Sequence, residues 1–222
     1  MKDLIKKLLP VWLKKRLRLI VKFFKYHYRC QLIKGPISRN EKIKIIVGAA
    51  ETFQQGWYST NEQWLDITKE EDWTKVFSDK KIITNVVAEH VFEHLTKEQC
   101  LKSLQNIHKH MIQGGRVRIA VPDGYNPDPD YLRHVGIAGI GDDAADHKQL
   151  LNVDVLKQLF ADIGFEPNHV EGYTKDGTLI TNEFLDDEGF IYRSRKHSTE
   201  KRRQRWAFVD AETSLIVDGI KL

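Results

Sequence analysis

The chain has 222 residues, 41% of them hydrophobic and 30% charged, and a formal net charge of +4. This balance is ordinary for a soluble globular protein, and the length suffices for one good-sized domain with its own core plus an extension. The two cysteines, Cys30 and Cys100, form no CxxC pair. This argues against a disulfide framework or a zinc ribbon and favours the reducing cytoplasm.

The positive charge is concentrated at the N-terminus. Residues 1–34 contain eleven Lys or Arg and one acid, Asp3, a net of +10, so the rest of the chain carries −6. Apolar residues recur with helical spacing between residues 5 and 24, and basic residues largely occupy the other face. The longest uncharged apolar run, residues 8–13, is far shorter than the ~20 residues that span a bilayer. The basic residues that follow it also interrupt any signal-peptide core.

Residues 1–34 therefore form a basic amphipathic arm, and its Trp12 and Phe24 are typical of interfacial membrane helices. The arm predicts contact with an anionic membrane surface and a peripheral location on the inner membrane face. The alternative is a helix packed on the body or on a second subunit. No nucleic acid partner is expected, because the aromatic residues do not interleave with the basic ones. Residues 35–41, with Gly35-Pro36, are predicted to be a linker to a body of residues 42–222.

The body opens with a predicted strand at residues 43–47, and Gly56-Trp57 follow it within a few residues. This connection is too short for a helix, so the first crossover is predicted to be a loop. A second strand is predicted at residues 57–60. Thr68 is predicted to cap a helix over residues 69–77 that has acids in its first turn.

A third strand is predicted at residues 81–87. Thr96, followed by Glu98 and Gln99, predicts the start of a helix that ends at Gly114-Gly115. A fourth strand is predicted at residues 116–121.

Residues 126–146 form a Pro-, Asp- and Gly-rich loop, long enough to be functional. Asn152 is predicted to cap a helix over residues 153–163, which Gly164 terminates. The last strands are predicted near residues 165–173, 190–192 and 214–220. Strands that alternate with helices predict an α/β protein with a mostly parallel sheet covered on both faces.

Short motifs follow one another in a fixed order along the body. They are Val47-Gly48-Ala49-Ala50-Glu51-Thr52, Gly56-Trp57, Leu65-Asp66-Ile67, Glu89-His90-Val91-Phe92-Glu93-His94-Leu95, Gly114-Gly115-Arg116, Val121-Pro122-Asp123, Asp146-His147-Lys148, Gly164-Phe165 and Ser214-Leu215-Ile216-Val217-Asp218. This ordered set resembles the predicted S-adenosylmethionine-dependent methyltransferases of class I fold, in a bacterial branch associated with surface-polysaccharide assembly. The resemblance implies a Rossmann-like sheet of seven strands with an antiparallel last strand, and S-adenosylmethionine as the cofactor.

The resemblance also implies cofactor contacts at the carboxyl ends of three strands. A glycine after the first strand lets the backbone approach a ligand closely, since a Cβ would collide. The chain keeps Gly48 but has alanines where the family usually has a second glycine. An acid that ends the second strand grips the ribose hydroxyls, and Asp66 is placed for the adenine amino group or, alternatively, is a turn residue. The predicted cofactor-binding residues are Gly48, Ala49, Ala50, Glu51, Asn61, Glu62, Asp66, Ala88 and Glu89.

Three residues are predicted to be catalytic. A sugar hydroxyl is a poor nucleophile, so its proton must leave as the new bond forms, and a histidine suits that task. His90, just past a strand end, is the first choice of base, oriented by Glu89 or Asp123. Asp123 is predicted to face the same crevice. His147, at the end of the 126–146 loop, is the alternative base, arriving when the loop closes.

The pairs Glu89-His90 and Glu93-His94 also invite comparison with a zinc helix, because the histidines are four residues apart. The zincin motif places Glu directly after the first His, where this chain has Val91. No third ligand is evident from the sequence, so no metal site is predicted.

The sequence as a whole predicts an S-adenosylmethionine-dependent methyltransferase that O-methylates a small-molecule or lipid-linked glycan at the inner membrane face. The alternative is a membrane-attached binding or scaffold protein whose cofactor loop has degenerated. A nicotinamide dehydrogenase is disfavoured, because the loop lacks G-x-G-x-x-G spacing.

Overall fold

The computed structural model describes residues 31–50, 52–141, 144–198 and 214–222, together with eight residues of the arm: Pro10, Leu13, Arg16, Leu17, Ile20, Val21, Phe24 and Tyr28. The predicted N-terminal amphipathic helix thus lies largely outside the described residues, as does Glu51. Among the helices that are described, none has both the length and the apolar composition needed to cross a membrane.

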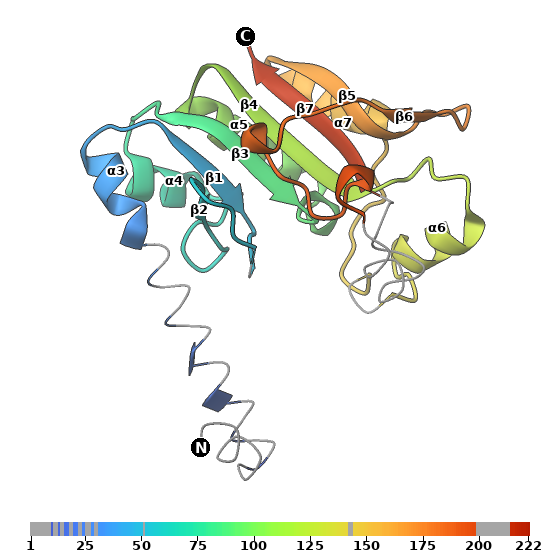
Figure 1. The fold of residues 1–222 in the computed structure, drawn as a ribbon, viewed down its shortest axis with the longest axis horizontal. Helices are drawn as coiled ribbons and strands as arrows, with labels where there is room; N and C mark the ends of the chain where they lie inside the picture. Colours follow the sequence, from blue (N-terminus) through green and yellow to red (C-terminus); the bar gives the residue numbers. More distant parts are fainter. Residues whose placement is uncertain are drawn as a thin grey trace.

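Seven strands form one mixed sheet in the order β2-β1-β3-β4-β7-β5-β6 (Figure 1). The strands are β1 (Ile43–Val47), β2 (Tyr58–Ser59), β3 (Ile83–Glu89), β4 (Met111–Pro122), β5 (Phe165–Tyr173), β6 (Leu179–Thr181) and β7 (Ser214–Lys221). Strands β2, β1, β3 and β4 are parallel, whereas β7 runs antiparallel between β4 and β5. The prediction of a mostly parallel, Rossmann-like sheet with an antiparallel last strand is confirmed.

Three helices cover one face of the sheet: α4 (Glu70–Phe77), α5 (Lys97–His110) and α7 (Val153–Ile163). Alternate strand residues such as Ile45, Val117 and Val217 point into this layer, as the two-residue period of a strand requires. In Figure 1, α5 and α7 lie behind the sheet. The main core therefore lies between one face of the sheet and these helices.

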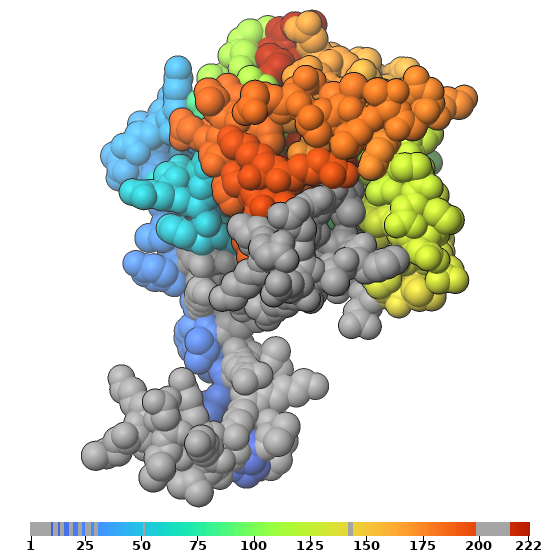
Figure 2. Space-filling view, turned by 45° about the vertical axis from the view of Figure 1, so that its right-hand side comes forward, coloured from blue at the N-terminus to red at the C-terminus, as the bar shows by residue number. Residues whose placement is uncertain are grey.

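The opposite face is covered by residues 182–198, an irregular segment with two short 3-10 turns, η2 (Asp186–Glu188) and η3 (Arg195–His197). It buries Phe184 and Ile191 against a second apolar cluster that includes Ile46 and Val87. Figure 2 shows its orange residues as an outer layer between the blue-cyan start of the body and yellow-green α6 (Pro129–Val135). Both faces are covered as predicted, but no helix contributes to this layer among the residues described.

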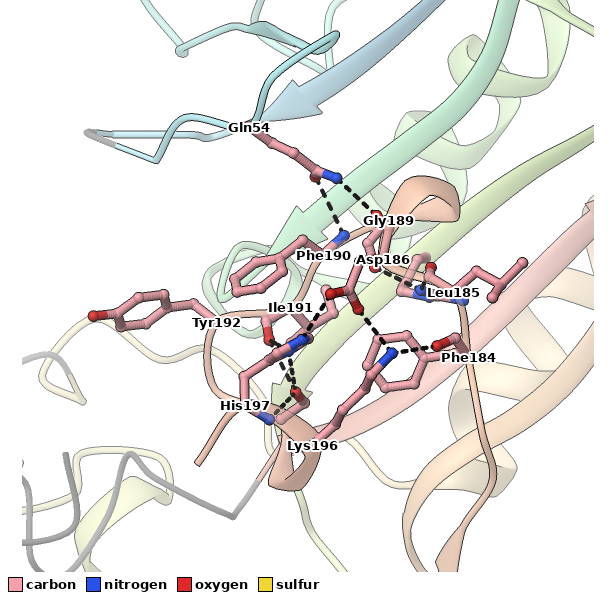
Figure 3. A network of polar contacts seen from close by, with 12 residues as sticks. Gln54, Phe184, Leu185, Asp186, Gly189, Phe190, Ile191, Tyr192, Lys196 and His197 are labelled. Carbon is pink, nitrogen blue, oxygen red and sulfur yellow. Dashed lines mark hydrogen bonds and ion pairs between the residues drawn. The ribbon is translucent and has the colours of Figure 1, made fainter. Parts of the chain in front are cut away.

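Side chains from distant parts of the chain, rather than a strand ladder, hold this segment in place. Figure 3 shows one of them, Gln54, together with the polar contacts within the segment itself. Gln54 accepts a hydrogen bond from Phe190 N and donates to Asp186 O, and Glu89 accepts from Tyr192 N and Arg193 N. The strand predicted near residues 190–192 is therefore wrong, because its backbone groups bond to side chains instead of to a neighbouring strand.

Most predicted helix ends are confirmed. Thr96 and Gln99 form a reciprocal capping box, Asn152 Oδ1 accepts from Val155 N, and Gly164 ends α7 at φ +93°. The cap at Thr68 is wrong: Lys69 is the N-cap, and Thr68 Oγ1 donates to Asp66 Oδ1 instead.

Three predicted boundaries also differ from the structure. Helix α5 ends at His110, and Gly114-Gly115 lie inside β4. The 126–146 loop contains α6, capped by Asp128 Oδ1. The predicted linker is wrong in part, because residues Lys34–Ser38 form helix α3, and Ile33 and Ile37 are buried in the main core.

One buried histidine makes the stability of this core depend on pH. His110 is fully buried, stacks on Trp73 with 5.6 Å between ring centroids, and lies 3.2 Å from Lys80 O through Nδ1. Burial lowers the pKa of His110, although the hydrogen bond to Lys80 opposes the shift. The unfolded chain therefore takes up this proton first, so the stabilisation is complete above about pH 6.5 and is lost as pH falls through the folded-state pKa.

We expect the melting temperature to fall between pH 7 and pH 5, and the fall to be smaller in His110→Phe, which cannot titrate. Thermal unfolding followed by circular dichroism across this range measures both slopes. His108 and His169, whose pKa values burial also lowers, retain part of the slope in the variant. Equal slopes in the two proteins would show that His110 does not contribute.

Candidate functional site

The strand order places the candidate site at one edge of the sheet. Strand β1 has β2 on one side and β3 on the other, so the chain reverses its direction of travel across the sheet between β1 and β3. Ligands of open α/β sheets bind at the carboxyl ends of the strands, at such a switch point. The loops after β1, β2, β3 and β4 meet there, and β7, being antiparallel, begins there with Ser214 opposite Pro122.

The loop after β1 has the backbone conformation that the resemblance implies. Gly48 and Ala50 have φ values of +59° and +45°, and the end of β2 fixes the loop, because Ala49 N donates to Thr60 O and Ala50 N to Asn61 Oδ1, both at 2.9 Å. Asn61 thus supports the loop. Ala49 is only 3% exposed and belongs to the second apolar cluster.

The sequence did not reveal what lies above Gly48. A Cβ at this position would come within 2.5 Å of Val91 Cγ2. The glycine is therefore required by a neighbour in this chain, whether or not a ligand also approaches the backbone.

The predicted acidic residues differ in their availability. Asp66 Oδ1 accepts from Thr68 N and Oγ1, and Lys69 Nζ lies 2.9 Å from Oδ2. Burial acts to raise the pKa of Asp66, but Lys69 and Thr68 outweigh it and lower the pKa below its ordinary value. Asp66 fits the alternative interpretation as a turn residue. Glu62, by contrast, is exposed at the edge.

The two predicted contacts at the end of β3 are engaged within the fold. Ala88 is fully buried in the main core, so its side chain faces away from the edge. Glu89 binds two backbone N–H groups of the 182–198 segment, at 2.7 and 3.0 Å. The carboxylate of Glu89 therefore anchors this segment, and it does not orient His90 as predicted.

His90 lies at the edge with a constrained backbone. Its φ is +54°, unusual for a residue with a Cβ, and its N–H donates to Ala120 O at 2.8 Å. Its ring lies between two side chains: Nδ1 is 2.9 Å from Glu93 Oε1, and Nε2 is 3.4 Å from Ser214 Oγ. An ionised carboxylate this close favours the proton on Nδ1, which leaves the lone pair on Nε2 at the edge. Glu93, and neither Glu89 nor Asp123, orients His90.

Glu93 is 1% exposed, yet its surroundings favour the ionised form. Burial acts to raise its pKa, but His90, its own backbone N–H and His94 outweigh this and hold the pKa below its ordinary value. A partial signal for this role was present in the chain, because Glu93 follows the apolar pair Val91-Phe92 three residues after His90.

The prediction that Asp123 faces the crevice is wrong. Asp123 is 1% exposed, and its two oxygens accept from Tyr125 N at 2.9 Å and Tyr173 N at 2.7 Å. Burial raises the pKa of Asp123, although these bonds and the charge of Arg195 oppose the shift. The Asp123 side chain therefore links the end of β4 to the end of β5 and stabilises the fold.

His147 is already in place beside this edge, with 8% exposure. Lys148 N donates to Glu93 O, which ties its segment to η1 (Phe92–His94), and the rings of His147 and His94 lie 4.8 Å apart. His147 is therefore packed, where the sequence predicted arrival by loop closure. His147 also lies close to Glu93 and His94, a grouping of potential ligands that does not include His90 and that the sequence did not reveal.

No protein-family model matches the chain, and no curated protein matches it in sequence. Solved structures with a similar arrangement include a SAM-dependent methyltransferase from Archaeoglobus fulgidus, at 14% identity over 90% of this chain and 98% of that one, with a TM-score of 0.46. A SAM-dependent methyltransferase from Mesorhizobium loti has 11% identity over 82% and 92% of the two chains, with a TM-score of 0.44. The YcgJ protein from Bacillus subtilis has 11% identity over 88% and 98%, with a TM-score of 0.42. Each TM-score is below 0.5, so the strand order and the residues of this chain carry the functional argument.

Proposed function

We propose that this protein is an S-adenosylmethionine-dependent methyltransferase that binds its cofactor at the carboxyl edge of β1, β2 and β3. The observation that carries the proposal is the strand order, in which a switch point lies between β1 and β3 and an antiparallel β7 lies beside β4. This is the sheet that the motif resemblance implies. Two observations thus support a methyltransferase: the arrangement of the strands, which is an analogy of fold, and the order of the motifs along the chain.

The residues at the edge fit such a cofactor in part. The exposed backbone at Gly48 and Ala50 is open to a ligand, and the exposed carboxylate of Glu62 is the acid available for the two ribose hydroxyls. Bound S-adenosylmethionine would supply a methyl group on a sulfonium, whose transfer depends mainly on the positioning of the acceptor.

His90 is the residue we propose for the acceptor side. Glu93 holds its ring so that Nε2 faces the edge beside Ser214. A hydroxyl placed at Nε2 would give up its proton there as the bond to the methyl group forms. A glycan hydroxyl suits this arrangement, so O-methylation of a small-molecule or lipid-linked glycan is the proposed reaction.

The arm supports a membrane-bound acceptor. Of its described residues, Leu17, Ile20, Val21 and Phe24 recur at helical spacing and are 42–64% exposed. An exposed apolar stripe within a segment of net charge +10 fits the surface of an anionic membrane. We therefore propose that the protein works on the inner membrane face.

Binding of the cofactor is the direct test. We expect S-adenosylmethionine and S-adenosylhomocysteine each to raise the unfolding free energy, by about 2.7 kcal/mol at 100 times the Kd. Calorimetry should show Glu62→Gln binding roughly 10-fold or more weakly, because hydrogen bonds to a charged group contribute about 1.5–3 kcal/mol. The control is Glu166→Gln, an equally exposed acid on β5, which should bind like the wild type.

A second candidate function is favoured by one observation, the position of Val91 over Gly48. In a membrane-attached scaffold with a degenerate cofactor loop, this packing would serve the fold alone. Absence of any shift with either ligand up to millimolar concentration would reject the enzyme and favour the scaffold.

A further inference from the structure

A compact group of potential metal ligands lies beside the candidate site. Glu93 and His94 from η1 and His147 from the segment between α6 and α7 each offer one ligand atom, and these atoms all lie within 4.8 Å of one another. Two of the residues adjoin in sequence, and the third is brought in by the docking of its loop.

The buried carboxylate of Glu93 is an independent sign that a cation belongs here. His90 Nδ1 lies 2.9 Å from Oε1, but among the described residues no well-formed hydrogen bond reaches either oxygen. A carboxylate that is 1% exposed and has so few partners is costly to bury, so a further positive charge beside it would stabilise the site. A metal ion would compensate the negative charge of Glu93 and would be coordinated by one of its oxygens.

The neighbours of the two histidines match those found around metal-bound imidazoles. His147 Nδ1 lies 2.8 Å from Val135 O, and a carbonyl can only accept, so Nδ1 carries the proton and Nε2 the lone pair. His94 Nδ1 lies 3.0 Å from Asp146 Oδ1, a 76% exposed carboxylate at the rim, within ion-pair distance but without the alignment of a hydrogen bond. Metal-bound histidines typically hold their other nitrogen against a carbonyl or a carboxylate in this way.

Backbone and amide hydrogen bonds fix the group before any ion binds. Lys148 N and Gln149 N both donate to Glu93 O, and Gln149 Nε2 donates to Leu95 O at 2.8 Å. The capping box at Thr96 then starts α5 directly after η1. These bonds tie the segment that carries His147 to η1, which carries Glu93 and His94.

We propose that Glu93, His94 and His147 bind a divalent transition metal ion. Two imidazoles and one carboxylate suit Zn²⁺, Fe²⁺, Mn²⁺ or Co²⁺, whereas Mg²⁺ and Ca²⁺ prefer oxygen ligands alone. Ligand atoms around a tetrahedral Zn²⁺ are about 3.4 Å apart, so the three side chains must draw together by roughly 1 Å on binding. Three protein ligands leave a coordination position for water or for an oxygen of a small molecule.

Glu93 also orients His90, but the binding of a metal ion is measured without cofactor or acceptor, so this test can fail or succeed separately from that of methyl transfer. The full chain is stripped with a chelator and dialysed, and titrations with Zn²⁺ and Co²⁺ are followed by calorimetry and by the visible absorption of Co²⁺. We expect one equivalent to bind and to raise the melting temperature, with Mg²⁺ and Ca²⁺ giving no comparable shift.

Variants assign the site. His147→Ala and His94→Ala should weaken binding by more than about 100-fold, since even second-shell partners contribute 10–100-fold. Asp146→Asn should weaken binding by about 10–100-fold, because it changes the partner of His94. Asp146 is exposed, so this variant should fold, and it tests the proposal even if a ligand variant does not fold. His134→Ala, on the same loop in α6, is the matched control and should bind like the wild type.

Two results would overturn the proposal. One is a folded wild-type chain that binds neither Zn²⁺ nor Co²⁺ when the metal is present at about 100 times a micromolar protein concentration. Binding weaker than this is roughly what adventitious surface sites show. The other is a folded Asp146→Asn or His147→Ala variant that binds as tightly as His134→Ala. In either case the three side chains would be a packed cluster, with the His94 and His147 rings stacked edge to face at 73°.

Discussion

Arg118→Met is expected to lower the free energy of unfolding by about 3–5 kcal/mol, because it removes the buried partner of a buried carboxylate and leaves that carboxylate only the bond to Arg116. Arg118 and Asp218 are 0% and 1% exposed and pair through two bonds, Nε to Oδ1 at 2.7 Å and a second NH group to Oδ2 at 2.8 Å. The guanidinium also donates to Leu185 O and Gly189 O, so it links the central strands to the 182–198 segment. Methionine keeps much of the volume and removes every one of these bonds.

Arg116→Met is the matched control, since Arg116 is two residues away on β4 and binds the same Asp218 Oδ2 at 2.6 Å. Its side chain is 24% exposed, so water can replace part of what is lost. We expect no more than about half the effect of Arg118→Met in urea unfolding, because partly hydrated ion pairs contribute less. Equal losses in the two variants would show that burial of the pair does not decide its energy.

Gly48→Ala is expected to destabilise the protein by about 2–5 kcal/mol, from two separable causes. A residue with a Cβ at φ +59° costs about 1–2 kcal/mol, and overpacking against Val91 Cγ2 at 2.5 Å costs a further 1–3 kcal/mol. Gly56→Ala isolates the first cause, because Gly56 has φ +80° and a Cβ there meets no atom within 4 Å.

A double-mutant cycle isolates the second cause. In Val91→Ala the space above Gly48 is free, so adding Gly48→Ala should then cost only the backbone strain, with a coupling energy of about 1–3 kcal/mol. Chemical unfolding of the four proteins measures it. Zero coupling would mean that the two residues do not contact each other in solution. Cofactor titration of the Val91→Ala protein shows in addition whether Val91 obstructs the ligand.

The parts of the fold that sequence predicted well are those determined by local signals. Strand β1, helix α7 and its cap at Asn152 follow from a hydrophobic period, a capping side chain and a terminal glycine, all within a dozen residues. Residues 182–198 carry no such period. Their conformation depends on Lys44, Gln54 and Glu89, which lie more than 100 residues away in the chain.

The candidate site divides in the same way. The edge was predictable, because each strand ends in glycine or polar residues, and Gly48 and His90 do lie there. The roles of Val91, Glu93 and Ser214 were not predictable from the sequence. Each depends on a contact across the switch point, of Val91 with Gly48 and of Glu93 and Ser214 with His90. Asp123 misled for the same reason: a strand-end acid was expected to face the crevice, but it pairs with backbone amides of β5.

The place of β7 in the sheet has a consequence for synthesis on the ribosome. Strands β4 and β5 do not pair with each other, because β7, formed by residues Ser214–Lys221, fills the gap between them. While the chain emerges, β5 therefore has no partner on that side, and the backbone groups along the edge of β4 stay unpaired until β7 arrives. Such late, non-local pairing slows folding and leaves strand edges available to other chains. We therefore expect the nascent protein to depend on chaperones until translation reaches β7.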